Sequence, residues 1–278
     1  RPALPSIITD LAFARHRVGD SAQAISSLVA GTLHSGAYVW TGAELANASA
    51  PPLLHLACAA AIHSMASVLC GGSSVLGGYL SRCADRTVRL WSAPPVAAAA
   101  AVRLTPLTFG GLSAGPRGGT QMAAVAWTPV ADAEPADAEA LLLVAADGAD
   151  GVVSWHLSPT LTVPCAADDE VLGVNSCRAS RTILPRGARV LAIALLPASA
   201  ACAHPQLACG TEDGTIVVLY PELPSGPNAA PQWLVKCTVV VQPKVAAQTS
   251  GVVQLAWSLS GSWIYAACAD GVLHAIEA

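Results

Sequence analysis

Alternation of apolar and polar residues is the main pattern along this chain, and it recurs in short segments that end at Ser, Gly or Pro. The clearest segments are residues 7–14, 123–130, 190–198 and 252–263, with a weaker one at 65–72. Alternation with a period of two and enrichment in Val, Ile, Leu and Trp are typical of β-strands. Helical periodicity is absent, so the pattern predicts an all-β protein.

A second pattern is a tight turn that leads into another alternating strand. Its best copy is CADRTVRLWSA at residues 83–93, in which the strand ends at Trp91 and Ser92. Similar stretches place five turn residues in register: His34, Asp85, Asp150, Asp213 and Asp270. Successive anchors are 51, 65, 63 and 57 residues apart. A compact propeller repeat needs about 40 to 45 residues, so the spacing predicts five repeats with long loops.

Each repeat holds enough strands for one blade of a β-propeller. An inner strand precedes the turn, the turn joins two strands, and a further short apolar run follows in the first four repeats. Four strands make up one propeller blade. We therefore predict a single β-propeller domain over residues 1–278. The expected blades span about 6–52, 53–104, 105–163, 164–235 and 236–278.

The fifth repeat contains three strands, the last within GVLHAIEA at residues 271–278. An unpaired strand edge is a template for pairing with another strand. We expect a propeller that is open as it stands or that is completed in one of two ways. Either further sequence supplies the missing strands, or a partner donates a strand or a blade.

The turn and strand at residues 85–92 resemble the repeat unit of the WD-repeat family, which ends in an Asp-containing turn, an alternating strand and a Trp-Asp pair. DRTVRLWS is a near match, with Ser92 in the position of the final Asp. Leu219 and Ile276 stand where Trp is expected in two other repeats. The resemblance implies a WD-repeat-type β-propeller.

The resemblance also implies structural roles for particular residues. Side-chain to backbone hydrogen bonds should brace the turns at Asp85, Asp150, Asp213 and Asp270. Trp40 and Trp91 should pack between neighbouring blades. The Gly-His dipeptide common in the family occurs nowhere in this sequence. The family's His-Ser-Asp-Trp hydrogen-bond network is therefore not expected here.

Composition supports a folded intracellular domain. Apolar residues make up 53% of the chain and charged residues 12%, which is enough to form a large core. The net charge of -4 gives no basic field for nucleic acid, and no window has the roughly 18 apolar residues of a membrane span. Nine cysteines without a paired framework predict reduced thiols. We expect a cytoplasmic or nuclear protein with no membrane insertion and no direct nucleic-acid partner.

Four arginines lie close together on one predicted connection between blades. They are Arg178, Arg181, Arg186 and Arg189. Such a cluster can contact an acidic partner, although it is more typical of a solvated loop. Elsewhere, the Cys202–Cys209 segment lacks a second half-site for zinc, and no nucleophile elbow is present. The sequence therefore predicts no catalytic, cofactor-binding or metal-binding residues.

Two classes of function are compatible with this architecture. The first is a non-catalytic protein-protein interaction scaffold, a structural subunit of a coat, nuclear-pore, dynein, ciliary or similar assembly. The alternative is an enzyme or ligand-binding propeller with a site at the central channel. Such a site needs polar residues on several inner strands, whereas LAFA, AVAW, AIAL and QLAW are mostly apolar. We expect the scaffold, with other protein subunits as partners and no cofactor.

Overall fold

The strands of the chain form five consecutive antiparallel units in the computed structural model. The structure describes residues 6–17, 24–34, 36–41, 54–56, 58–69, 78–92, 107–110, 112, 122–127, 140–147, 150–157, 179–198, 204–222, 232–241 and 250–278. Within these ranges the secondary structure is almost entirely strand, with a single short 3-10 turn at Pro185–Gly187. The prediction of an all-β fold is confirmed.

The first four units have four strands each. The first contains β1 (Ile8–Arg17), β2 (Ala24–Thr32), β3 (Ala37–Thr41) and β4 (Leu54–Leu56). The second contains β5 (Ile62–Leu69), β6 (Gly78–Cys83), β7 (Val88–Ser92) and β8 (Leu107–Phe109). The third contains β9 (Met122–Trp127), β10 (Ala140–Ala146), β11 (Gly151–Leu157) and β12 (Ala179–Ile183). The fourth contains β13 (Val190–Leu196), β14 (Gln206–Thr211), β15 (Thr215–Pro221) and β16 (Trp233–Val240).

The described part of the fifth unit has three strands: β17 (Val252–Trp257), β18 (Trp263–Cys268) and β19 (Leu273–Glu277). In every unit the strands pair in chain order, as in a propeller blade. The second and third blades also join through their inner strands, since β5 pairs in parallel with β9 at Val68 and Ala124. The predicted division into five blades is confirmed.

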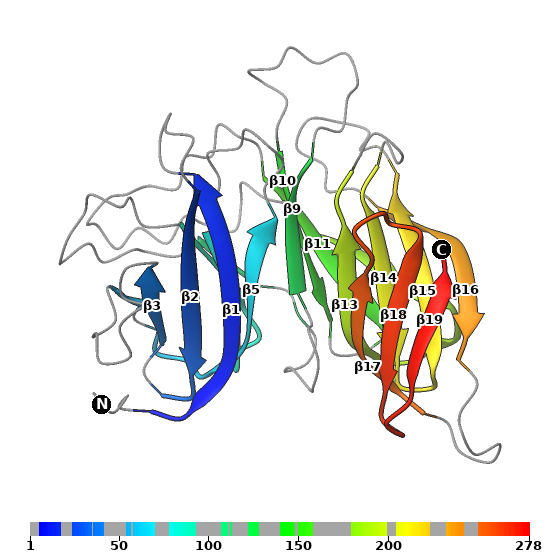
Figure 1. Ribbon diagram of the computed structural model, residues 1–278, viewed down its shortest axis with the longest axis horizontal. Coiled ribbons are helices and arrows are strands. Elements are labelled where there is room, and N and C mark those ends of the chain that lie inside the picture. Colours follow the sequence, from blue (N-terminus) through cyan, green and yellow to red (C-terminus); the bar gives the residue numbers. More distant parts are fainter. Residues whose placement is uncertain are drawn as a thin grey trace, which may run out of the picture.

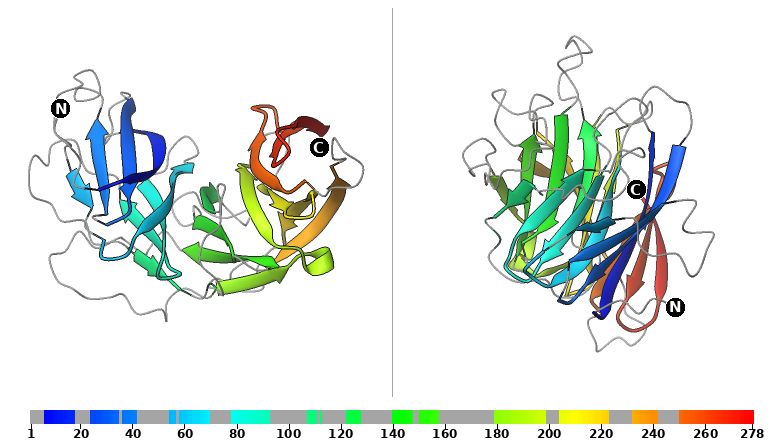
Figure 2. Two further views of the ribbon diagram at one scale, coloured as in Figure 1. Left: turned by 90° about the horizontal axis from the view of Figure 1, so that it is seen from below. Right: turned by 90° about the vertical axis from the view of Figure 1, so that its left-hand side faces the viewer.

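The blades stand side by side in an arc (Figure 1), and the first and fifth lie at its opposite ends (Figure 2, left). The outer strands lie later in the chain than the expected blade limits. The limits place 52 at the end of the first blade and 163 at the end of the third, whereas β4 begins at Leu54 and β12 at Ala179. None of the five aligned turn anchors lies in the connections before these strands, so the alignment of the repeats does not mark where the strands begin.

Apolar side chains from two neighbouring blades fill each contact between blades. Along β14, Leu207 and Cys209 pack toward the third blade, whereas Ala208 between them packs toward the fifth. Along β6, Tyr79 packs toward the first blade and Leu80 toward the third. This alternation follows from the period of two along a strand. The core is therefore a series of four layers between blades.

Two glycines allow close approach between blades at equivalent positions, one residue before the end of the second strand. A Cβ atom at Gly31 would lie 2.8 Å from the Cγ2 atom of Ile62 in the second blade. A Cβ atom at Gly210 would lie 2.5 Å from the Cγ1 atom of Val252 in the fifth blade. These distances are too short for ordinary contact, so inner strands at both ends of the arc pack directly on a glycine backbone.

Gly210→Ala should therefore overpack the contact between the fourth and fifth blades. We expect the free energy of unfolding to fall by about 1 to 3 kcal/mol, as for other additions to a packed core. Chemical denaturation measures the change. The matched control is Gly110→Ala, because nothing lies within 4 Å of a Cβ atom at Gly110. Equal midpoints for the two variants would contradict the close packing at Gly210.

Candidate protein-interaction surfaces

A common turn joins the second and third strands of the blades. The backbone N–H of Cys83 donates to the carbonyl of Thr87 at 2.9 Å, and Asp147 donates to Gly151 and Cys268 to Val272 at the same distance. The residue that donates this bond, the turn-closing residue, fixes the register of each blade. Asp85, Asp213 and Asp270 each stand two residues after it.

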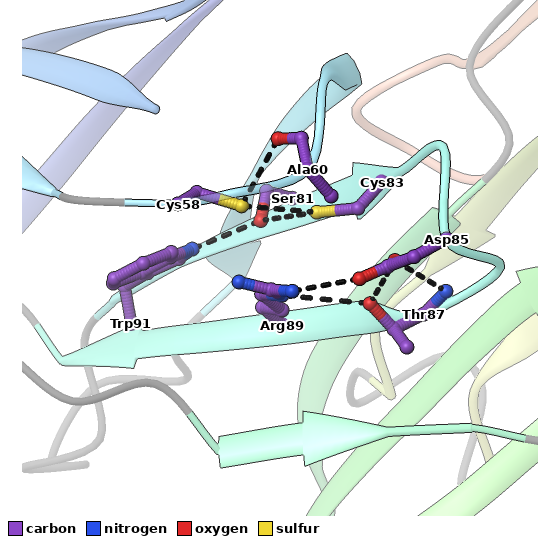
Figure 3. A network of polar contacts seen from close by, with 8 residues as sticks. All are labelled: Cys58, Ala60, Ser81, Cys83, Asp85, Thr87, Arg89 and Trp91. Atoms are coloured by element: carbon purple, nitrogen blue, oxygen red, sulfur yellow. Dashed lines mark hydrogen bonds and ion pairs between the residues drawn. The ribbon is translucent and has the colours of Figure 1, made fainter. Parts of the chain in front are cut away.

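The carboxylate of Asp85 accepts three hydrogen bonds (Figure 3). The donors are the backbone N–H of Thr87 at 3.1 Å, its hydroxyl at 2.6 Å, and Arg89 at 2.7 Å. Burial by itself raises the pKa of Asp85, but the bonds from Thr87 and Arg89 outweigh it and hold the pKa below its ordinary value. Asp85 thus braces its turn while remaining exposed.

Two other turns repeat this arrangement. The carboxylate of Asp213 accepts a bond from the backbone N–H of Thr215 at 3.1 Å and another from the Thr211 hydroxyl. Asp270 accepts a bond from the backbone N–H of Val272 at 3.1 Å. Side chains two residues after the turn-closing residue therefore support the backbone in the second, fourth and fifth blades.

Asp150 differs from these three residues. It stands three residues after the turn-closing residue Asp147, and its carboxylate accepts a hydrogen bond from Arg181 at 3.1 Å. Alignment of the repeats on Asp150 displaces the third blade by one position. With the register corrected, Trp155 lies in the same position as Trp40 and Trp91. The spacing from Asp147 to Trp155 in the sequence indicates this register. The alignment used Asp150 as the turn residue instead and therefore missed it.

Trp91 packs in the layer between the first and second blades, and its side chain is fully buried. Its indole N–H donates to the hydroxyl of Ser81 at 2.9 Å (Figure 3). Trp155 occupies the next layer, with its ring centroid 5.7 Å from that of Phe109. Trp40 is half-buried beside Tyr38. Sequence reasoning missed Ser81. Without a Gly-His dipeptide the family's hydrogen-bond network was not expected, although the bond between Trp91 and Ser81 is present.

Trp91→Phe should keep most of the ring contacts but leave the buried Ser81 hydroxyl without its indole donor. The expected loss in the free energy of unfolding is about 1 to 3 kcal/mol. Ser81→Ala should cost a similar amount, and the double variant should cost less than the sum because both changes remove one bond. Denaturant titration of all three variants measures the coupling. Strict additivity would show that the bond contributes nothing.

A buried charge network joins the second and third blades. The side chain of Arg82, on β6, is fully buried and donates to the carbonyl of Ala146 on β10. Burial lowers the pKa of Arg82 to about 10, and the charge of Asp147 opposes this effect. The buried carboxylate of Asp147 also pairs with Arg181 at 2.6 Å. Sequence reasoning missed both Arg82 and Asp147.

Asp147→Ala should leave the charge of Arg82 uncompensated between two blades. Removing one partner of a buried ion pair typically costs about 3 to 5 kcal/mol, and we expect a loss of that size in the free energy of unfolding. The matched control is Asp150→Ala, which removes a half-exposed partner of Arg181 and should cost below about 1 kcal/mol. A small effect at Asp147 would contradict the proposed charge compensation.

The structure separates the members of the arginine cluster. Arg181 lies on β12 and is bound to Asp147 and Asp150, and Arg189 pairs with Glu212 at 3.7 Å. Arg186 is exposed in the turn before β13, with a φ of 72°. Arg178 lies outside the described residues. Part of the segment that was expected to connect two blades is therefore the outer strand β12. The guanidinium groups of Arg181 and Arg189 have carboxylate partners in the chain.

Apolar side chains cover the outward face of the first blade. On β1, Ala12 is buried against the second blade, whereas Leu11 and Phe13 point to the other side. Their exposed fractions are 51% for Leu11 and 67% for Phe13. We call Leu11 and Phe13 the first-blade face.

The fifth blade has a similar outward face. On β18, Ile264 and Ala266 pack on the fourth blade, whereas Trp263 and Tyr265 are each 42% exposed. Leu273 on β19 is 71% exposed. It pairs with Ala267 of β18, which lies on the same side of the sheet as Tyr265 and Trp263. We call Trp263, Tyr265 and Leu273 the fifth-blade face. Strand β19 is also the edge of its sheet.

Residues 240–275 match the family model "WD domain, G-beta repeat". This segment covers the turn at Asp270 and most of the fifth blade, whose geometry the other blades repeat. The chain is a β-propeller that contains a WD repeat.

A solved structure is similar to this chain in fold. The crystal structure of BBS1N in complex with ARL6DN, soaked with lead, is similar with a TM-score of 0.55 and 14% sequence identity. The match covers 97% of this chain and 62% of that chain, so this WD-repeat propeller spans less than two thirds of its structural neighbour. A search of curated proteins returns no match.

Other kinds of site find little support in the part of this propeller that the structure describes. Within the described ranges, no three His, Cys, Asp or Glu side chains gather closely enough to hold a metal ion. Cys209 is buried within β14. Among the same residues, no helix has the length and apolar character to cross a membrane.

Proposed function

We propose that this WD-repeat propeller is a non-catalytic protein-interaction scaffold, a structural subunit of a larger multiprotein assembly. The observation that carries the proposal is the pair of uncovered apolar faces at the two ends of the arc. In the interior of the arc, each blade buries such a face against its neighbour. The end blades have the same kind of surface and no described neighbour to cover it.

The size and chemistry of these side chains suit a protein partner. Trp and Tyr are enriched at protein interfaces because they combine a large apolar area with a polar group. Burial of apolar surface stabilises a complex by roughly 25 cal/mol per Å² before the costs of association. At the fifth-blade face, the unpaired edge of β19 adds backbone hydrogen-bonding groups to this apolar surface. A partner that supplies a strand or a blade would satisfy both.

The type of assembly is part of the proposal. Degenerate propellers of this kind fit subunits of coat, nuclear-pore, dynein or ciliary complexes, and the similar crystal structure is itself a complex of BBS1N with ARL6DN. The arginine cluster is a second, electrostatic contact in this proposal. Arg186 is its most available described member, because Arg181 and Arg189 already have carboxylate partners within the chain.

The proposal predicts that residues 1–278 alone will self-associate or unfold early, because the described residues do not cover the end faces. Light scattering measures the mass in solution and thermal unfolding measures the stability. Leu273→Lys should reduce self-association by placing a charge on the fifth-blade face. The matched control is Leu259→Lys, since Leu259 is fully exposed in the turn between β17 and β18.

The same two variants test partner binding in the native complex. Leu273→Lys should reduce the recovery of co-purifying subunits at least several-fold, whereas Leu259→Lys should leave it unchanged. A monodisperse monomer that unfolds cooperatively, together with unchanged recovery for Leu273→Lys, would refute the proposal that these faces need a partner.

A further inference from the structure

Two cysteines of the second blade lie within contact distance in the layer that packs on the first blade. The Sγ atoms of Cys58 and Cys83 are 3.8 Å apart, and both thiols are free (Figure 3). Cys58 precedes β5, and Cys83 ends β6 at the turn braced by Asp85. The members of this pair are 25 residues apart, and no motif in the sequence links them.

We propose that Cys58 and Cys83 form a reversible disulfide on exposure to a peroxide, which makes this pair an oxidative modification site. The inference does not depend on the proposed scaffold role. A disulfide has a sulfur–sulfur distance of about 2.05 Å. The two sulfur atoms therefore need to approach each other by less than about 2 Å. The pair already shares one packed layer, so no rearrangement of the blades is required to bring the residues together.

The surroundings give the two thiols different roles. The bond from Cys83 and the charge of Arg89 lower the pKa of Cys58 to about 7, against the opposing effects of burial and the charge of Asp85. The neighbouring Cys58 and burial both raise the pKa of Cys83. The thiolate is the form that attacks peroxide. Cys58 is 7% exposed and Cys83 fully buried, so Cys58 is also the more accessible of the two.

The chemistry proceeds in two balanced steps. The Cys58 thiolate attacks one oxygen of hydrogen peroxide, which breaks the O–O bond, oxidises the sulfur to a sulfenic acid and releases hydroxide. The Cys83 sulfur then attacks the Cys58 sulfur and displaces the sulfenic hydroxyl. The thiol proton of Cys83 leaves with that hydroxyl as water, and the disulfide remains.

Other described cysteines lack this combination of features. Burial raises the pKa of Cys209 and also that of Cys268. Cys237 is half-buried on β16. Among the described cysteines, the recorded sulfur–sulfur contact is that of Cys58 with Cys83. Among the described cysteines, oxidation at low peroxide should therefore select this pair.

Oxidation should also stabilise the second blade. The new bond would tie the segment before β5 to the turn after β6 and close a loop between positions 58 and 83. Closing a loop of this size restricts the unfolded chain. For a chain of this length, we expect the melting temperature to rise by about 5 to 10 °C relative to the reduced protein.

Peptide mapping of the peroxide-treated chain tests the proposal. Trypsin releases Cys83 in residues 83–86 and Cys58 in residues 18–82, which also contain Cys70. The experiment therefore uses residues 1–278 with Cys70→Ser, treated with hydrogen peroxide and then alkylated. We expect mass spectrometry to find these two peptides cross-linked, with the loss of two hydrogen atoms. Dithiothreitol should reverse both the cross-link and the rise in melting temperature.

Two further variants complete the test. Cys58→Ser should abolish the cross-link and the thermal shift, whereas the matched control Cys237→Ser should retain both. Recovery of residues 83–86 with Cys83 alkylated after peroxide treatment would overturn the proposal, as would over-oxidation of Cys58 without a cross-link. Both outcomes are read from the chain that retains Cys58 and Cys83, so they do not depend on whether Cys58→Ser folds.

Discussion

The packing of each blade on the next is the constraint on which the rest of this structure depends. An interior blade buries both faces of its sheet, and β10 shows the result: every residue from Leu141 to Ala146 is buried. Such strands need apolar residues at nearly all positions, which accounts for an apolar content of 53%. The first and fifth blades have one neighbour each. Their outward faces also carry apolar side chains, and Leu11, Phe13, Trp263 and Leu273 are exposed there.

Three kinds of residue stand just before the turn-closing residue, and each allows the next blade to pack closely in a different way. At Gly31 and Gly210 the next blade packs directly on the backbone. At Ala146 a methyl group suffices. Arg82 occupies the same position in the second blade and places a charge in the layer, where Ala146 and Asp147 of the third blade compensate it. A buried pair of this kind gives specificity to one blade contact rather than stability, because other blades offer no matching carboxylate at this position.

The sequence was sufficient for the fold because strand alternation and the Asp turns are local signals. It was insufficient for the register of the third blade, where Asp147 and Asp150 compete as turn anchors and the spacing to Trp155 decides between them. The outer strand β12 follows a long connection that contains none of the aligned turn anchors. Arg82 and Ala146 lie in neighbouring blades, 64 positions apart. Such contacts depend on which blade faces are adjacent, and a single repeat does not specify that.

Because each blade contacts its sequential neighbours, the arc behaves as a nearly one-dimensional stack, in which stability is a sum of blade and contact terms. The interior blades keep their contacts whether or not the ends are covered. A partner at Trp263 and Leu273 would stabilise the fifth blade first, and through Gly210 and Val252 the fourth. Oxidation at Cys58 and Cys83 would act at the other end of the stack. Binding and oxidation would therefore stabilise different blades, and their effects on unfolding should be close to additive.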